Sequence, residues 1–126
     1  MSDAILNFHH GVTYVAAIWY IGGRGKDFLC SVTREKDDAS FKLTYRLRNH
    51  RDDSVEVHEA VYEGQDGEPG AIQGADDLAE AFVGLGYGPT VHKLLLQTTD
   101  VFLILDRLSK APWAEVRHVG PPIGIA

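Results

Sequence analysis

The sequence predicts an α+β fold: a four-stranded antiparallel meander followed by helix, strand, helix and strand, packed as one two-layer domain. Residues 13–63 alternate between apolar and polar side chains, and a period of two indicates strands with one buried face. The breaks between these stretches are short, and short turns join antiparallel neighbours. Beyond them the apolar residues recur at helical spacing. A length of 126 residues fits one domain, expected to comprise residues 1–126.

The first half is expected to form four consecutive strands. In the third, Phe41 and the alternate residues after it point one way, while Lys42 and its alternates point the other. In the fourth, Val55, Val57 and Val61 are expected on the core face. The four strands are expected at residues 13–21, 27–34, 40–49 and 54–63, with turns at 22–25, 35–38 and 51–53.

The second half begins with residues 64–74, which their glycine and proline content predicts to be a loop. A helix is then expected from Asp76, ending at Gly86 or Gly88. A strand follows at residues 91–97, and a last strand is expected at 113–119.

Residues 100–110 fit two interpretations. Their apolar run suits a buried strand, whereas Asp100 as an N-cap, Arg107 near the end and Pro112 beyond it suit a helix. The helix is favoured, although the period of so short a run does not separate the two.

Composition narrows the function classes. The formal net charge of −6 disfavours nucleic-acid binding, which depends on neutralising phosphates. No apolar run is long enough to cross a membrane, and the N-terminus lacks the pattern of a secretory signal. The single cysteine, Cys30, cannot form an internal disulfide, which favours a reducing compartment and a cytoplasmic location.

One sheet face is the best candidate for a binding surface. Arg46, Arg48 and His50 share the polar side of the third strand. The first strand is apolar on both sides, which indicates that part of this second face is covered by helices or by a second subunit, and a homodimer partner is the favoured interpretation. The predicted binding face consists of Arg46, Arg48, His50, Glu56, His58, Tyr62 and Trp19.

Candidates for chemistry are few. Strict alternation places Glu59 beside Val57 and Val61, and a carboxylate in apolar surroundings either pairs with a cation or keeps a proton useful in acid catalysis. A bulge or strand end that turns Glu59 outward is the favoured alternative. Cys30, between apolar neighbours, is expected to be inert core.

No cofactor is predicted, because neither glycine-rich stretch has the spacing and the flanking elements of a nucleotide-binding loop. His50, His58 and Glu56 could together form a metal triad. No compact metal motif supports it, so scattered surface histidines are favoured and no metal site is predicted.

Three function classes remain. The leading expectation is a non-enzymatic interaction module that acts through a sheet face, as a homodimer or with a protein partner. The alternative is a small-molecule-binding domain, with an aromatic-lined pocket between sheet and helices that accepts an anionic or apolar ligand. A hydrolase or isomerase that uses Glu59 or a histidine comes last.

Overall fold

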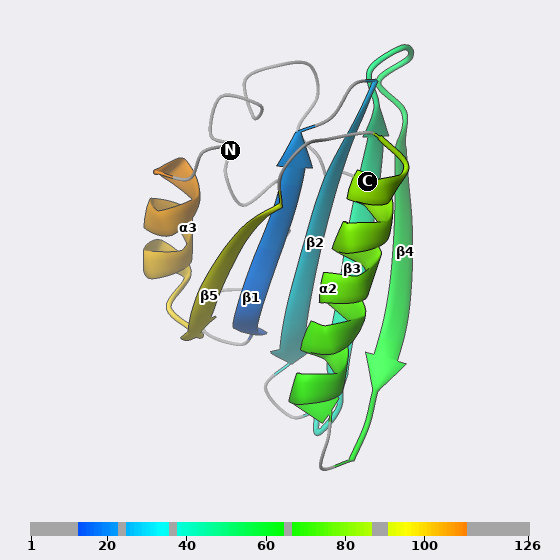
Figure 1. The fold of residues 1–126 in the computed structure, drawn as a ribbon. Coiled ribbons are helices and arrows are strands. Elements are labelled where there is room, and N and C mark those ends of the chain that lie inside the picture. Colours follow the sequence, from blue (N-terminus) through cyan, green and yellow to red (C-terminus); the bar gives the residue numbers. More distant parts are fainter. Residues whose placement is uncertain (1–12, 23–24, 36–37, 65–66, 87–90, 111–126) are drawn as a thin grey trace.

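The computed structural model describes residues 13–22, 25–35, 38–64, 67–86 and 91–110. Its elements are β1 (Thr13–Gly22), β2 (Lys26–Glu35), β3 (Phe41–Asn49), β4 (Val55–Tyr62), α2 (Gly67–Gly84), β5 (His92–Thr98) and α3 (Val101–Ser109). The antiparallel sheet has the order β4-β3-β2-β1-β5, and α2 lies across one of its faces (Figure 1). The predicted α+β meander is confirmed, while the strand expected at 113–119 lies outside the described residues.

Side-chain hydrogen bonds shape two of the turns between strands. Asp38 accepts from the backbone N–H of Ser40 at 2.9 Å, and Asp52 accepts from that of Ser54 at 3.0 Å. Aspartate favours such turns because its carboxylate replaces a backbone acceptor two residues before the donor. The turn between β3 and β4 spans four residues, 50–53, and is closed by the hydrogen bond from Asn49 N–H to the Ser54 carbonyl at 2.9 Å.

Helix α2 begins well before the predicted start. The segment 64–74, predicted to be a loop, supplies the first turns of a helix that runs from Gly67 to Gly84. Its small residues serve close packing: a Cβ added at Gly74 would collide with the Tyr62 hydroxyl, and one at Gly70 would touch the same ring. The prediction was wrong because tertiary packing over Tyr62 outweighs the low helix propensity of glycine.

The main core lies between the sheet and α2. Alanines of the helix pack onto Trp19, Phe28 and Cys30, all buried, and Phe82 closes the end against Phe28 with ring centroids 5.2 Å apart. The predicted core role of Cys30 is confirmed, and burial raises the pKa of its thiol.

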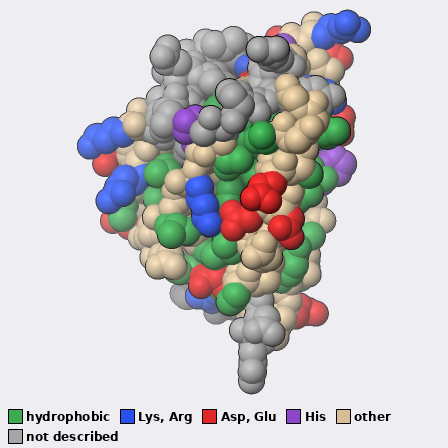
Figure 2. Space-filling model, viewed as in Figure 1, with side chains coloured by type: hydrophobic (Ala, Val, Ile, Leu, Met, Phe, Trp, Pro, Cys, Tyr) green, Lys and Arg blue, Asp and Glu red, His purple; other side chains and the backbone are tan. Residues whose placement is uncertain are grey.

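Carboxylates gather over the middle of α2 on the face seen in Figure 2, beside basic side chains. Asp76 was predicted to start the helix and instead lies inside it. It accepts the indole N–H of Trp19 at 2.7 Å, and Lys93 of β5 lies 3.3 Å from the same oxygen. Asp76 therefore joins α2 to β1 and β5.

A smaller core covers the opposite face at β1. The register of β1 slips at Ala16, so Val15 joins Ile18 and Tyr20 on the side away from α2. Ile104 and Leu108 of α3 pack there. The second face of β1 is therefore buried as predicted, but a helix of the same chain covers it.

Helix α3 confirms the favoured interpretation of residues 100–110. Asp100 is its N-cap and accepts from the backbone N–H groups of Phe102 at 3.0 Å and Leu103 at 3.2 Å. Its buried residues, Val101, Ile104 and Leu108, recur at helical spacing, so one side of the helix is buried while Phe102 and Leu103 are exposed.

Candidate functional site

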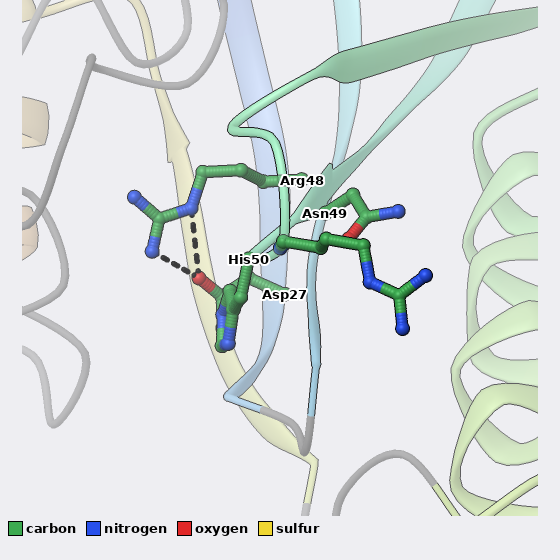
Figure 3. A network of polar contacts seen from close by, with 5 residues as sticks. Asp27, Arg48, Asn49 and His50 are labelled. Carbon is green, nitrogen blue, oxygen red and sulfur yellow. Dashed lines mark hydrogen bonds and ion pairs between the residues drawn. The ribbon is translucent and has the colours of Figure 1, made fainter.

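A buried ion pair joins β2 and β3 at one end of the sheet, on the face opposite α2. The register places Asp27 directly across from Arg48. Both Nε, at 3.1 Å, and Nη2, at 2.7 Å, of Arg48 donate to Oδ2 of Asp27 (Figure 3). His50 lies in the turn after β3, with Nε2 3.0 Å from Oδ1 of Asp27. Both carboxylate oxygens are therefore engaged.

The burial and the hydrogen bonds of this network are those of a structural ion pair. The side chains of Asp27 and Arg48 are each only 3% exposed, so neither charge is solvated by bulk water. The backbone N–H of His50 also donates to the carbonyl of Gly25 at 2.8 Å, which ties the turn after β3 to the start of β2. Burial, followed by the charge of Asp27, raises the pKa of the neighbouring Tyr20 hydroxyl. The network thus joins β2, β3 and the turn after β3 at one end of the sheet.

Arg46 lies on the same face, two residues before Arg48, and its surroundings differ. It stands across from Leu29 on β2 and Val57 on β4. The residue is only 9% exposed, and its buried Nε has no hydrogen-bond partner among the described residues. Burial lowers the pKa of the guanidinium, and the charge of Glu59 acts in the opposite direction. Arg46 is thus a buried cation without an ion pair in the described part of the chain.

The predicted binding face is divided between the two sides of the sheet. Arg46, Arg48 and His50 gather as expected around the far face. Glu56, His58 and Tyr62 instead lie on the α2 side, where the ring of His58 stacks on Tyr45 with centroids 4.8 Å apart. Trp19 is fully buried beneath α2. Prediction of one common face was wrong.

The length of one turn explains this error for the three residues of β4, namely Glu56, His58 and Tyr62. A turn of three residues at 51–53 would pair Arg46 with His58, whereas the observed turn of four pairs it with Val57. A register shift of one residue moves every side chain of a strand to the other face. For the same reason Val55, Val57 and Val61, predicted to face the core, project from the side away from α2, where Val55 packs against the smaller core and the other two are exposed.

Glu59 lies beside Val57 and Val61 on one face, as strict alternation predicts, but this face is open at β4. Its side chain is 54% exposed and forms an ion pair with Lys42 at 3.9 Å. The register between β3 and β4 is regular, so no bulge is needed to bring Glu59 to solvent. The apolar surroundings that would make it a catalytic acid are not formed by the described residues.

Asp27, which joins the predicted Arg48 and His50 into one network, was not among the predicted site residues. The predicted turn at 35–38 would pair position 27 with position 46, whereas the observed register pairs it with position 48, so the sequence alone carried no signal for this contact. The three side chains of the disfavoured metal triad do not come together: Glu56 contacts His58 at 3.2 Å, while His50 contacts Asp27. Within the described ranges, no three His, Cys, Asp or Glu side chains gather closely enough to hold a metal ion.

Comparisons with protein-family models, curated proteins and solved structures found no match. Among the described helices, none combines the length and the apolar character that a membrane crossing requires. The case for a function therefore depends on the site itself.

Proposed function

We propose that this chain is a small binding domain that holds an anionic ligand against the far face of its sheet, with Arg46 as the anchor. The observation that carries this proposal is the burial of Arg46 without an ion pair among the described residues. Removing a charged group from water costs several kcal/mol unless an opposite charge and hydrogen bonds compensate. A bound anion would supply both.

Arginine suits this task chemically. Its guanidinium keeps its charge when buried, and its planar fork of N–H donors matches the oxygens of carboxylates and phosphates. Arg48, two residues along, is held by Asp27 and positions the strand. Arg46 is therefore the group that a ligand would contact.

The test is thermal unfolding with phosphate, sulfate and acetate, on the native chain and on Arg46→Gln. An anion at about a hundred times its dissociation constant adds about 2.7 kcal/mol, or about 10 °C in a domain of 126 residues. We expect this shift in the native chain and its loss in Arg46→Gln. Arg107→Gln, which removes an exposed cation from α3, is the matched control and should keep it. Equal responses from both variants, or none from the native chain, would refute the proposal.

A second candidate function, self-association, is supported by the outer edge of β4. In the described sheet this strand has one neighbour, β3, and its Val57 and Val61 are half exposed or more. Two such edges could pair to form a continuous antiparallel sheet in a homodimer. Light scattering should then give twice the monomer mass, with Val61→Lys monomeric and Leu85→Lys still dimeric. A monomer at every accessible concentration would eliminate this candidate.

A further inference from the structure

We propose that the anion held by Arg46 is a small monocarboxylate with an extended apolar body, its carboxylate on the guanidinium and its chain along β4. The inference rests on the proposed function and names the ligand class for that site. The charges of the far face and the exposed apolar surface beside Arg46 support this inference independently.

The charge of the far face indicates a monoanion. Arg48 is paired with Asp27, and Lys42 is paired with Glu59. Among the described side chains in the middle of this face, Arg46 is the cation left without an ion pair. A single positive charge balances one carboxylate, whereas a phosphate dianion would bring excess negative charge into a site with little water.

The surface beside Arg46 indicates an apolar body. Val57 stands directly across from Arg46 and is 50% exposed, while Val61 on the same face is 59% exposed. Leu29 flanks Arg46 on the other side and is buried. A chain that runs from Arg46 past Val57 to Val61 would cover about 13 Å of strand, and it would remove apolar surface from water on both partners.

Glu59 projects between Val57 and Val61, on the face where the ligand would lie. Its charge therefore gives a specific test, in which the direction of the change in ligand affinity is predicted. Its carboxylate is the described negative charge that acts on Arg46, and Lys42 holds it at the surface. A carboxylate ligand must compete with Glu59 for Arg46. Removing the charge of Glu59 should therefore tighten binding, whereas removing Lys42 should release Glu59 toward Arg46 and weaken it.

The experiment is isothermal titration of the full chain with acetate, hexanoate, decanoate, decanol and phosphate. We expect affinity to rise about two- to fourfold per methylene from acetate to decanoate. Decanol and phosphate should bind at least about tenfold more weakly than decanoate, because each lacks one of the two contacts. Glu59→Gln should tighten decanoate and Lys42→Gln should weaken it, each severalfold.

Val57→Thr with Val61→Thr is the matched control, because both changes are exposed and keep the β-branched shape. This variant should keep acetate affinity and lose most of the dependence on chain length. Equal binding of acetate, decanoate and phosphate would overturn the inference while leaving Arg46 as an anion site. No response to any anion would refute the proposed function as well. Decanol as tight as decanoate would show an apolar surface without an anion site.

Discussion

Removal of one partner of the Asp27–Arg48 ion pair should destabilise the protein far more than removal of a surface pair. In Arg48→Met, the carboxylate of Asp27 stays buried and loses the guanidinium that neutralises it, while the half-exposed His50 still contacts its other oxygen. Breaking a buried pair in this way costs about 3–5 kcal/mol. At about 4 °C per kcal/mol for 126 residues, the unfolding midpoint should fall by about 12–20 °C.

The control lies on the same strand and face. Lys42→Met breaks the exposed pair with Glu59, and such pairs contribute about 1 kcal/mol or less. In the double variant Asp27→Leu with Arg48→Met, both charges are gone, so stability should return to within about 1 kcal/mol of the native chain or exceed it.

Urea unfolding, with unchanged m-values, is the assay. If Arg48→Met costs no more than Lys42→Met, the pair is not desolvated as the structure has it. If the stability costs of Asp27→Leu and Arg48→Met, each measured alone, simply add in the double variant, the two side chains are not coupled.

Three further predictions concern single side chains. The pKa of the Tyr20 hydroxyl is raised from its ordinary value of 10.0, so above pH 10 the native state retains a proton that the unfolded chain loses. The free energy of unfolding must therefore fall as the pH rises above that value. Urea titrations should show this fall, and Tyr20→Phe should flatten it. Gly74→Ala should destabilise the protein in thermal unfolding because the added Cβ meets the Tyr62 hydroxyl, although helix propensity alone predicts a gain of about 1 kcal/mol. Adding Tyr62→Phe, which removes that hydroxyl, should reverse part of the loss. A stabilised Gly74→Ala variant would disprove the close contact. Burial raises the pKa of the Cys30 thiol, so a thiol reagent should label it only as fast as the chain unfolds; rapid labelling of native protein would contradict its burial.

The fold could be predicted where a local pattern decides the structure. Alternation located all four strands of the meander to within a residue or two, and Asp100 identified the start of α3. The start of α2 could not be found in this way. Its first turns contain Gly67 and Gly70, which are poor helix formers, and they are helical because Tyr62 packs closely against them. That contact belongs to tertiary structure and leaves no local signal.

The site was predictable within one strand and not across strands. Arg46 and Arg48 share a face because β3 alternates, and this needs no partner. Which residues stand opposite them depends on the number of residues in each turn. One additional residue between β3 and β4 exchanged His58 for Val57 across from Arg46.

This exchange changes the chemistry of the face. With the predicted register, Arg46 and Arg48 would stand across from His58 and Glu56, and their charges would be partly balanced in an ordinary polar surface. With the observed register, Val57 stands across from Arg46 and Val55 stands across from Arg48, while Asp27 of β2 neutralises Arg48. The result is one buried cation beside exposed apolar surface, the combination that a carboxylate with an apolar body matches. The ligand class proposed for Arg46 therefore depends directly on the register between β3 and β4.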